Sequence, residues 1–152
     1  MRGMSMYGDG KMHKVFGQKE ETAYIDRRGA YLIPIQNGQI GVVQTDKGYF
    51  LLGGGLDHDE SDEACIEREC MEEAGYRVAV KHKIGSAEAY YKAPKIGYFH
   101  PIQTYYAGEL IEKICEPTEE DHTFIWMNYE DLRGRMYMEM QNWAIEEGWK
   151  AG

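Results

Sequence analysis

Short apolar runs separated by polar turns predict strands in the first half of the chain. Three segments rich in apolar, β-branched or aromatic residues have this pattern: 30–34, 40–44 and 49–52. Asn37-Gly38 separates the first two, and this dipeptide is typical of two-residue hairpin turns. A second turn is expected at 46–48. We therefore predict a hairpin and a third strand that runs into three consecutive glycines.

A different pattern follows the glycines. The segment 61–74 is dominated by Ala, Glu, Met and Arg, which favour helix, and Gly75 supplies a typical C-terminal stop. Its apolar residues Ile66, Cys70 and Ala74 recur every four positions, so they share one face of a helix. The sequence therefore predicts a helix with one buried face and one charged face.

The second half of the chain alternates strands with polar connections. We expect strands at 76–91, 97–110 and 124–127, a turn at 92–95, a polar loop at 116–122, and a terminal helix over 129–149 with a break near Gly134. Residues 1–12 are expected to be a loose N-terminal segment, and 13–152 a single domain. Strands around a central helix, with a second helix at the end, indicate an α/β fold with a mixed central sheet between helices.

The composition limits the class of protein. With 43% hydrophobic and 28% charged residues over 152 positions, the chain is typical of one soluble globular domain. It lacks the roughly 18 consecutive apolar residues of a membrane span and an apolar signal-peptide core. We therefore expect a cytoplasmic protein without a membrane partner.

Charge and cysteine content narrow the expected partners. The net charge of -9 disfavours nucleic-acid binding, which needs a basic stripe, although an acidic protein binds phosphates when a divalent cation bridges the like charges. Cys65, Cys70 and Cys115 form no C-x-x-C pair. We interpret them as reduced thiols, and Cys65 and Cys70 as packing residues.

One helix carries the candidate chemistry. Glu69, Glu72 and Glu73 have i, i+3, i+4 spacing, so their carboxylates share one helix face and repel one another unless a cation lies between them. Oxygen ligands favour a hard divalent ion, Mg2+ or Mn2+. Arg68 lies within reach of Glu72 and is expected to fix its rotamer, and glycines before the helix allow close backbone approach to phosphate.

The segment from Gly54 to Tyr76 resembles the signature of the Nudix hydrolase family, in which seven fixed positions have a set spacing. The matching residues are Gly54, Glu60, Arg68, Glu69, Glu72, Glu73 and Gly75. Cys70 and Tyr76 occupy the two positions where the family has aliphatic residues. Asp59 stands where many members have glycine. These departures remove no metal ligand, and they bear on packing and loop shape.

The resemblance implies a Nudix-type α/β/α sandwich and assigns roles to residues. Glu69, Glu72 and Glu73, with the carbonyl of Gly53, would hold the metal, and Glu60 and Gly75 would support the loop and helix. Family members often add a carboxylate from a downstream loop. The candidates are Glu119, Glu120 and Asp121, of which we favour Glu120. Glu69 or Glu120 would accept the proton of the attacking water.

The implied activity is Mg2+-dependent hydrolysis of a phosphoanhydride bond in a nucleoside diphosphate linked to another moiety. Two alternatives are a Nudix-fold module that senses a nucleotide without cutting it and an acidic helix without a ligand. Gly54, Gly55 and Tyr91 are candidate substrate contacts. Tyr91 and Pro94 favour different substrates and leave the choice open. Many family members form homodimers, so a homodimer is an expectation of the resemblance. Four histidines are expected at the surface or in loops: His58, His82, His100 and His122.

Overall fold

The computed structural model describes residues 4–6, 12–93 and 97–151. The described strands are β1 (Met4–Met6), β2 (Met12–Phe16), β3 (Ile25–Gln36), β4 (Gln39–Thr45), β5 (Gly48–Phe50), β6 (Leu52–Gly55), β7 (Tyr76–Ala89), β8 (Tyr91–Ala93), β9 (Gly97–Lys113) and β10 (Thr123–Asn128). The described helices are α1 (Asp62–Ala74), α2 (Tyr129–Leu132) and α3 (Glu139–Ala151).

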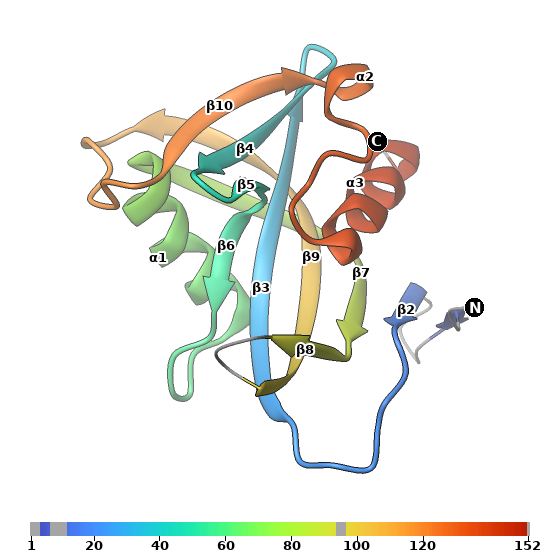
Figure 1. Cartoon of the computed structure of the whole chain (residues 1–152). Coiled ribbons are helices and arrows are strands. Elements are labelled where there is room, and N and C mark those ends of the chain that lie inside the picture. The colour runs from blue at the N-terminus through green and yellow to red at the C-terminus, as the bar shows by residue number, and fades with distance from the viewer. Residues whose placement is uncertain (1–3, 7–11, 94–96, 152) are drawn as a thin grey trace.

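The strands form a mixed sheet between two helices. Its main path runs β1-β2-β7-β9-β3-β4-β10, and β5, β6 and β8 pair with β4, β3 and β9. Strand β3 pairs parallel with β9 and antiparallel with β4 and β6. Helices α1 and α3 lie on opposite sides of the sheet (Figure 1). The predicted α/β fold with a mixed sheet between helices is confirmed.

The predicted hairpin is present between β3 and β4. Asn37 and Gly38 both have positive φ angles, 55° and 76°, as the turn that matches the twist of paired strands requires. The predicted third strand is divided at Leu51 into β5 and β6. Gly53, Gly54 and Gly55 belong to β6 and pair with β3, so the glycines form the strand itself rather than only its exit.

The predicted helix is confirmed as α1, and both ends follow from its sequence. Ser61 is the N-cap, and its hydroxyl accepts a hydrogen bond of 3.1 Å from the backbone N–H of Ala64. Gly75 ends the helix at φ 73°, where a Cβ would lie 1.9 Å from the carbonyl oxygen of Cys115. Only glycine fits this position, so the helix terminus and the chain after β9 approach each other closely.

Two hydrophobic clusters hold the layers together. The cluster under α3 contains Ile33, Leu51, Tyr105, Leu132, Met140 and Ile145 among others. The cluster under α1 contains Leu32, Leu52, Ile66, Cys65, Cys70 and Val78 among others. Cys65 and Cys70 are fully buried there, which confirms their packing roles. Tyr76 packs against the same cluster with its ring 6.0 Å from that of Phe124, so the sheet accommodates an aromatic residue at that position of the signature.

The structure differs from the sequence prediction at the N-terminus and around β8. Met4–Met6, within the segment expected to be loose, is a strand that pairs with β2, and β2, which was not predicted as a strand, pairs parallel with β7. The predicted strand 76–91 is interrupted at Tyr90, and the predicted turn at 92–95 begins in β8 and then lies outside the described residues. The predicted break of the terminal helix near Gly134 is confirmed, because residues 133–138 separate α2 from α3.

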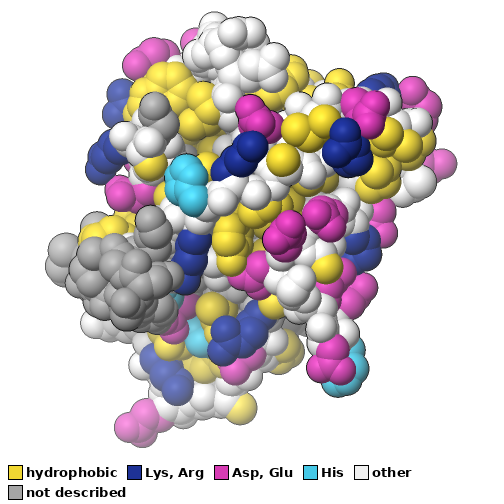
Figure 2. Space-filling view, turned by 180° about the vertical axis from the view of Figure 1, so that it is seen from behind, with side chains coloured by type: hydrophobic (Ala, Val, Ile, Leu, Met, Phe, Trp, Pro, Cys, Tyr) yellow, Lys and Arg dark blue, Asp and Glu magenta, His cyan; other side chains and the backbone are white. Residues whose placement is uncertain are grey.

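Charged side chains of both signs are distributed over the surface. The face shown in Figure 2 mixes acidic, basic and apolar groups without a continuous basic stripe. Within the described part of the chain, no helix is both long and apolar enough to cross a membrane.

Candidate functional site

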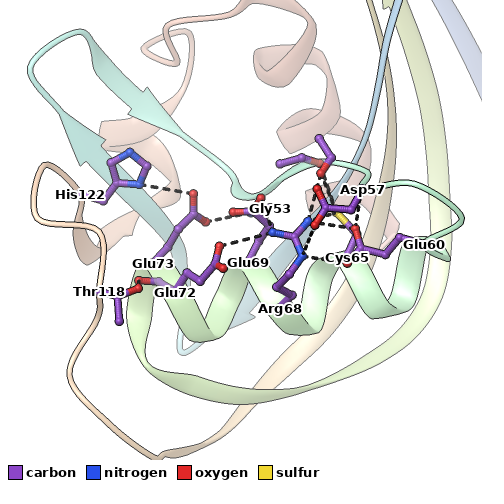
Figure 3. A network of polar contacts seen from close by, with 12 residues as sticks. Gly53, Asp57, Glu60, Cys65, Arg68, Glu69, Glu72, Glu73, Thr118 and His122 are labelled. Atoms are coloured by element: carbon purple, nitrogen blue, oxygen red, sulfur yellow. Dashed lines mark hydrogen bonds and ion pairs between the residues drawn. The ribbon is translucent and has the colours of Figure 1, made fainter.

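Helix α1 presents its carboxylates toward β6 and toward the loop before β10. Figure 3 shows Arg68 between two sets of acidic side chains, with Glu60 and Asp57 on one side and Glu69 and Glu72 on the other. Glu73 points away from this arginine, toward Gly53 and His122. The helix thus divides its acidic face into a region neutralised by arginine and a region without a nearby arginine.

Arg68 is bound on one side by the loop that precedes the helix. Its Nε lies 2.8 Å from Oε2 of Glu60 and its Nη2 lies 2.9 Å from Oε1, so the pair is bidentate. Nη2 also donates to the carbonyl of Gly55 at 3.1 Å. The hydrogen bond from Arg68, followed by that from the backbone N–H of Asp57, lowers the pKa of Glu60 to about 2. Glu60 is therefore ionised, and its ion pair with Arg68 connects the loop to the helix.

The free edge of the same guanidinium reaches the next turn of α1. Nη1 lies 3.2 Å from Oε2 of Glu69 and 3.4 Å from Oε1 of Glu72. The predicted ion pair between Arg68 and Glu72 is thus present, and Glu69 shares it. Arg68 holds these two carboxylates side by side and partly neutralises their repulsion.

Glu73 is the most deeply buried carboxylate of the site, with only 6% of its surface exposed. The backbone N–H of Gly53 donates to its Oε1 at 3.0 Å, and Nδ1 of His122 lies 3.4 Å from its Oε2. Burial is the main reason that the pKa of Glu73 is raised well above its usual range, and the negative charges of Glu69, Glu119 and Glu72 add to it. Burial likewise raises the pKa of Glu69, against the opposing charge of Arg68.

These carboxylates suit a divalent cation. Two of them are held in positions where their negative charge is disfavoured, and a hard cation with oxygen ligands would remove that penalty. Within the described residues, the side chains do not already converge as a group of three or more metal ligands. The contacts with Arg68 explain this, because they draw the oxygens of Glu69 and Glu72 toward the guanidinium. The donor set fits Mg2+ or Mn2+ in chemistry, and closure around an ion requires these side chains to turn.

The loop before β10 is tied directly to α1. The backbone N–H groups of Thr118 and Glu119 donate to the carbonyl of Glu72 at 2.9 and 3.2 Å. Of the three candidate carboxylates, Glu119 raises the pKa of both Glu69 and Glu73 through its charge, and Asp121 lines a cavity beside Glu73. Glu119 and Glu120 are both exposed, and neither lines a cavity at the site. The backbone bond to α1 and the charge effect on Glu69 and Glu73 favour Glu119 over the predicted Glu120.

Two cavities meet at the site and share Tyr31, Gly53 and Glu73. The first, of about 310 Å3, is lined by Arg27, Arg28, Glu69, Phe99, Gln103 and Met138 among others. The second, of about 350 Å3, is lined by Val43, Lys47, Phe50, Asp121 and His122 among others. Sequence reasoning missed Arg27, Arg28 and Gln103. The two adjacent arginines before the first predicted strand were a visible signal, whereas nothing in the sequence placed Gln103 near the signature.

The glycines set how closely side chains approach the backbone. A Cβ on Gly54 would lie 2.4 Å from Oε2 of Glu69, so this carboxylate occupies the space that any other residue would fill. A Cβ on Gly55 would meet nothing closer than 3.5 Å.

Asp59 has a φ of 61°, the left-handed conformation that favours glycine and that Asp tolerates better than most residues. This explains why aspartate is accommodated where many family members have glycine.

Other candidate residues lie elsewhere than the sequence suggested. Tyr91 packs against the hydrophobic cluster under α3, and its role as a substrate contact stays a prediction. His58 is almost fully exposed and pairs only with Asp59. The histidines were expected at the surface or in loops, and His122 lies in the loop before β10, where it contacts Glu73. His100 differs, because it lies on β9 between Asp26 and Glu88 with 12% of its side chain exposed.

Comparison with known proteins identifies relatives of this chain. Residues 26–146 match the sequence profile of a family described as NUDIX domain. A protein named Nudix hydrolase 17, mitochondrial, from Arabidopsis thaliana is 33% identical over 103 residues, which are 62% of this chain and 52% of that protein. The match therefore spans about half the length of this relative.

Solved structures share the fold. A MutT NUDIX hydrolase from Burkholderia pseudomallei aligns with a TM-score of 0.66 and 20% identity, over 81% of this chain and 98% of that one. A UDP-X diphosphatase aligns with a TM-score of 0.66 and 17% identity, over 87% and 66%. An ADP-ribose pyrophosphatase from Streptococcus suis aligns with a TM-score of 0.61 and 19% identity, over 83% and 92%. At these identities the comparison establishes the fold.

Proposed function

The chain belongs to the NUDIX family, and we propose that it is a divalent-metal-dependent hydrolase of a phosphoanhydride bond in a nucleoside diphosphate linked to another moiety. One observation carries the proposal. Of the signature carboxylates, Glu73 lines both cavities at their junction, and Glu69 lines the cavity that also has Arg27 and Arg28 in its wall. A diphosphate at this junction would have room for a group on either side.

We assign the metal to residues whose negative charges favour a bound cation. Glu69, Glu72 and Glu73, with the carbonyl of Gly53, would hold Mg2+ or Mn2+. A bound ion of this kind neutralises phosphate charge and lowers the pKa of a water for in-line attack on phosphorus. The raised pKa values of Glu69 and Glu73 support this assignment, because a cation would stabilise the charged forms that burial disfavours.

Side chains of the protein position the carboxylates, bind phosphate and accept a proton. Arg68, fixed by Glu60, holds Glu69 and Glu72 side by side next to the site. Arg27 and Arg28 bind phosphate oxygens, since within the described residues neither has an ion-pair partner. A carboxylate accepts the proton of the attacking water. Glu69 and the loop residue Glu119 are the acceptors that the geometry favours, and Glu120 remains the acceptor that the sequence predicted.

The shape of the site and the names of proteins with the same fold support the substrate class. Two solved structures with this fold are named ADP-ribose pyrophosphatase and UDP-X diphosphatase. Both names describe compounds in which a diphosphate joins a nucleoside to a second group. We include nucleotide sugars, ADP-ribose, dinucleoside polyphosphates and modified nucleoside triphosphates in the candidate class. A cytoplasmic location and a homodimer also remain proposals.

The test is turnover across that class in the presence of Mg2+. Native protein is compared with Glu72→Gln and Glu73→Gln, and with Glu67→Gln as a matched control, because Glu67 is an exposed glutamate on the same helix. We expect Mg2+-dependent release of nucleotide that both site variants abolish and the control retains. Intact nucleotide binding without turnover across the panel would instead identify a sensing module.

A further inference from the structure

The cavity of about 310 Å3 contains a buried amide outside the signature. Gln103, on β9, is only 3% exposed and lines the cavity together with Glu69 and Glu73. Its Oε1 accepts two hydrogen bonds, from the hydroxyl of Tyr105 at 2.8 Å and from Nε2 of Gln141 at 3.1 Å. The oxygen of this amide is therefore fully engaged on the side away from the cavity.

The direction of this amide is fixed by a backbone group. Oε1 of Gln141 accepts a hydrogen bond of 2.9 Å from the backbone N–H of Leu51, which can only donate. Gln141 must therefore donate a hydrogen bond from its Nε2, and the acceptor on Gln103 must be its Oε1. The Nε2 of Gln103 is left to face the other way. The hydrogen bonds from Leu51 to Gln141 and from Gln141 to Gln103 thus determine which atom of the Gln103 amide is oxygen and which is nitrogen.

The Nε2 of Gln103 has two N–H donors and only weak partners. Its nearest acceptors are the hydroxyl of Tyr31 at 3.5 Å and the sulfur of Met138 at 3.6 Å. Both partners also line the cavity. A buried donor without a good acceptor is unfavourable, and ligand binding is one way for such a group to gain its missing hydrogen bond. The position of this donor in the wall of a cavity makes it a recognition group.

We propose that this cavity is the base subsite of the nucleotide substrate and that Nε2 of Gln103 donates a hydrogen bond to an acceptor on the edge of the base. The inference rests on the proposed function, because it takes the phosphates to lie at Glu69 and Glu73. Phe99, Pro101 and Met138 supply apolar surface for a flat ring. Arg27 and Arg28 line the same cavity and would bind the charged part of the same ligand.

An uncharged acceptor suits this position better than a phosphate oxygen. A neutral amide at 3% exposure offers no charge to offset the desolvation of an anion. The cavity already has two cationic residues for that purpose. A ring nitrogen or carbonyl oxygen of a base is neutral and costs much less to bury. Nε2 of Gln103 therefore recognises the base, and Arg27 and Arg28 bind phosphate.

Discrimination between ligands with and without a base tests this assignment. Binding of AMP, GMP, CMP, UMP and ribose 5-phosphate is measured by calorimetry with Mg2+ present. We expect at least one nucleoside monophosphate to bind at least about 10-fold more tightly than ribose 5-phosphate, since a base that packs on Phe99, Pro101 and Met138 and satisfies a buried donor contributes at least this much. Equal binding of ribose 5-phosphate and all four nucleotides would overturn the proposal.

Two variants test the polarity of the amide. Gln103→Glu keeps an oxygen for Tyr105 and Gln141 but replaces the donor by an acceptor. Gln141→Glu changes no residue of the cavity wall, yet it turns the oxygen of Gln103 toward the cavity by demanding a donor in its place. Both should reduce the preference for a base to within about threefold. Gln44→Glu, at an exposed residue of β4, is the control with the same change in charge and should keep the preference. A preference unchanged in both buried variants would overturn the proposal.

Analogues of the preferred nucleotide give a test that does not depend on how the variants fold. In each analogue one acceptor of the base, a ring nitrogen or a carbonyl oxygen, is replaced by C–H or CH2. One such replacement should weaken binding to native protein about 10-fold, and equal binding of all analogues would contradict the proposal. Turnover is scored separately. Base preference without hydrolysis would remove the hydrolase proposal and keep the role of Gln103, and hydrolysis without base preference would do the reverse.

Discussion

Arg68 donates hydrogen bonds to both carboxylate oxygens of Glu60, and its remaining nitrogen forms ion pairs with Glu69 and Glu72. The loop before α1 and the carboxylate face of the helix are thereby joined through one guanidinium. Because a planar fork is required to bind one carboxylate in bidentate fashion and still reach two others, lysine cannot replace it. The position of the proposed metal ligands depends on a residue that is not itself a ligand.

Arg68→Lys should reduce activity roughly 10- to 100-fold, the usual effect of losing a group that orients metal ligands. The affinity for Mn2+, measured by calorimetry, should fall with it. Lys150→Arg, an exposed substitution of the opposite kind on α3, is the control. Unchanged Mn2+ affinity in Arg68→Lys would argue against the orienting role.

The Glu60 carboxyl predicts a pH dependence of stability. Its pKa is lowered from 4.5 to about 2 by Arg68, so the folded state favours the ionised form. The resulting stabilisation is complete above the ordinary value near 4.5 and is lost as the pH falls toward 2. Denaturation at several pH values should therefore show Glu60→Gln less stable than native protein at neutral pH, and the difference should shrink below pH 4.5. A gap that stays constant down to pH 2 would contradict this account.

Glu73→Gln should have opposite effects on stability and activity. Burial raises the pKa of Glu73, so the folded state binds a proton more readily than the unfolded chain, and stability without metal decreases as pH rises above 4.5. Removing the charge should raise the melting temperature in EDTA at neutral pH, by roughly 2–4 °C per kcal/mol gained. The same variant should lose its stabilisation by Mg2+. A lower melting temperature than native in EDTA would contradict the account.

Gly54→Ala and Gly55→Ala form a matched pair. A methyl group at Gly54 would occupy the space of Oε2 of Glu69, and at Gly55 it would meet nothing closer than 3.5 Å. Since the atom displaced at Gly54 is the end of a flexible side chain, we expect near-native melting temperature with activity reduced at least about 10-fold. Gly55→Ala should be much closer to native. Equal kinetics for the two variants would show that Glu69 does not need its present position.

The loop before β10 offers three carboxylates, and the structure ranks them. Glu119 raises the pKa of Glu69 and Glu73 through its charge, and its backbone N–H donates to the carbonyl of Glu72. Glu119→Gln should lower the rate roughly 100-fold if it accepts the proton of the attacking water, a usual size for general-base catalysis. Glu120→Gln should change it little. The reverse ranking, measured at saturating substrate and Mg2+, would restore the prediction made from the sequence.

Features set by neighbours in the chain were predictable. The turn at Asn37-Gly38, the N-cap at Ser61 and the stop at Gly75 each depend on local backbone conformation, which residue type controls directly. The spacing of Glu69, Glu72 and Glu73 follows from helix geometry alone. The core of the candidate site therefore came from the sequence, because it lies within one helix and the loop before it.

Features set by distant strands were not predictable. Antiparallel pairing of β1 with β2 places a strand in the segment that was expected to be loose. His122 meets Glu73 only because the loop before β10 is tied to the carbonyl of Glu72. Gln103 reaches the cavity because β9 pairs with β3, on which Tyr31 lies. None of these approaches leaves a local signal, since each depends on sheet order.

The most direct test of the central claim is 31P nuclear magnetic resonance of native protein with UDP-sugars, ADP-ribose, dinucleoside polyphosphates and modified nucleoside triphosphates, with Mg2+ and then with EDTA. The account predicts that in at least one compound the phosphoanhydride signals are replaced by those of its smaller phosphate products with Mg2+, and persist with EDTA. Product formation that is equal in EDTA, or phosphoanhydride signals that persist throughout the panel with Mg2+, would contradict it.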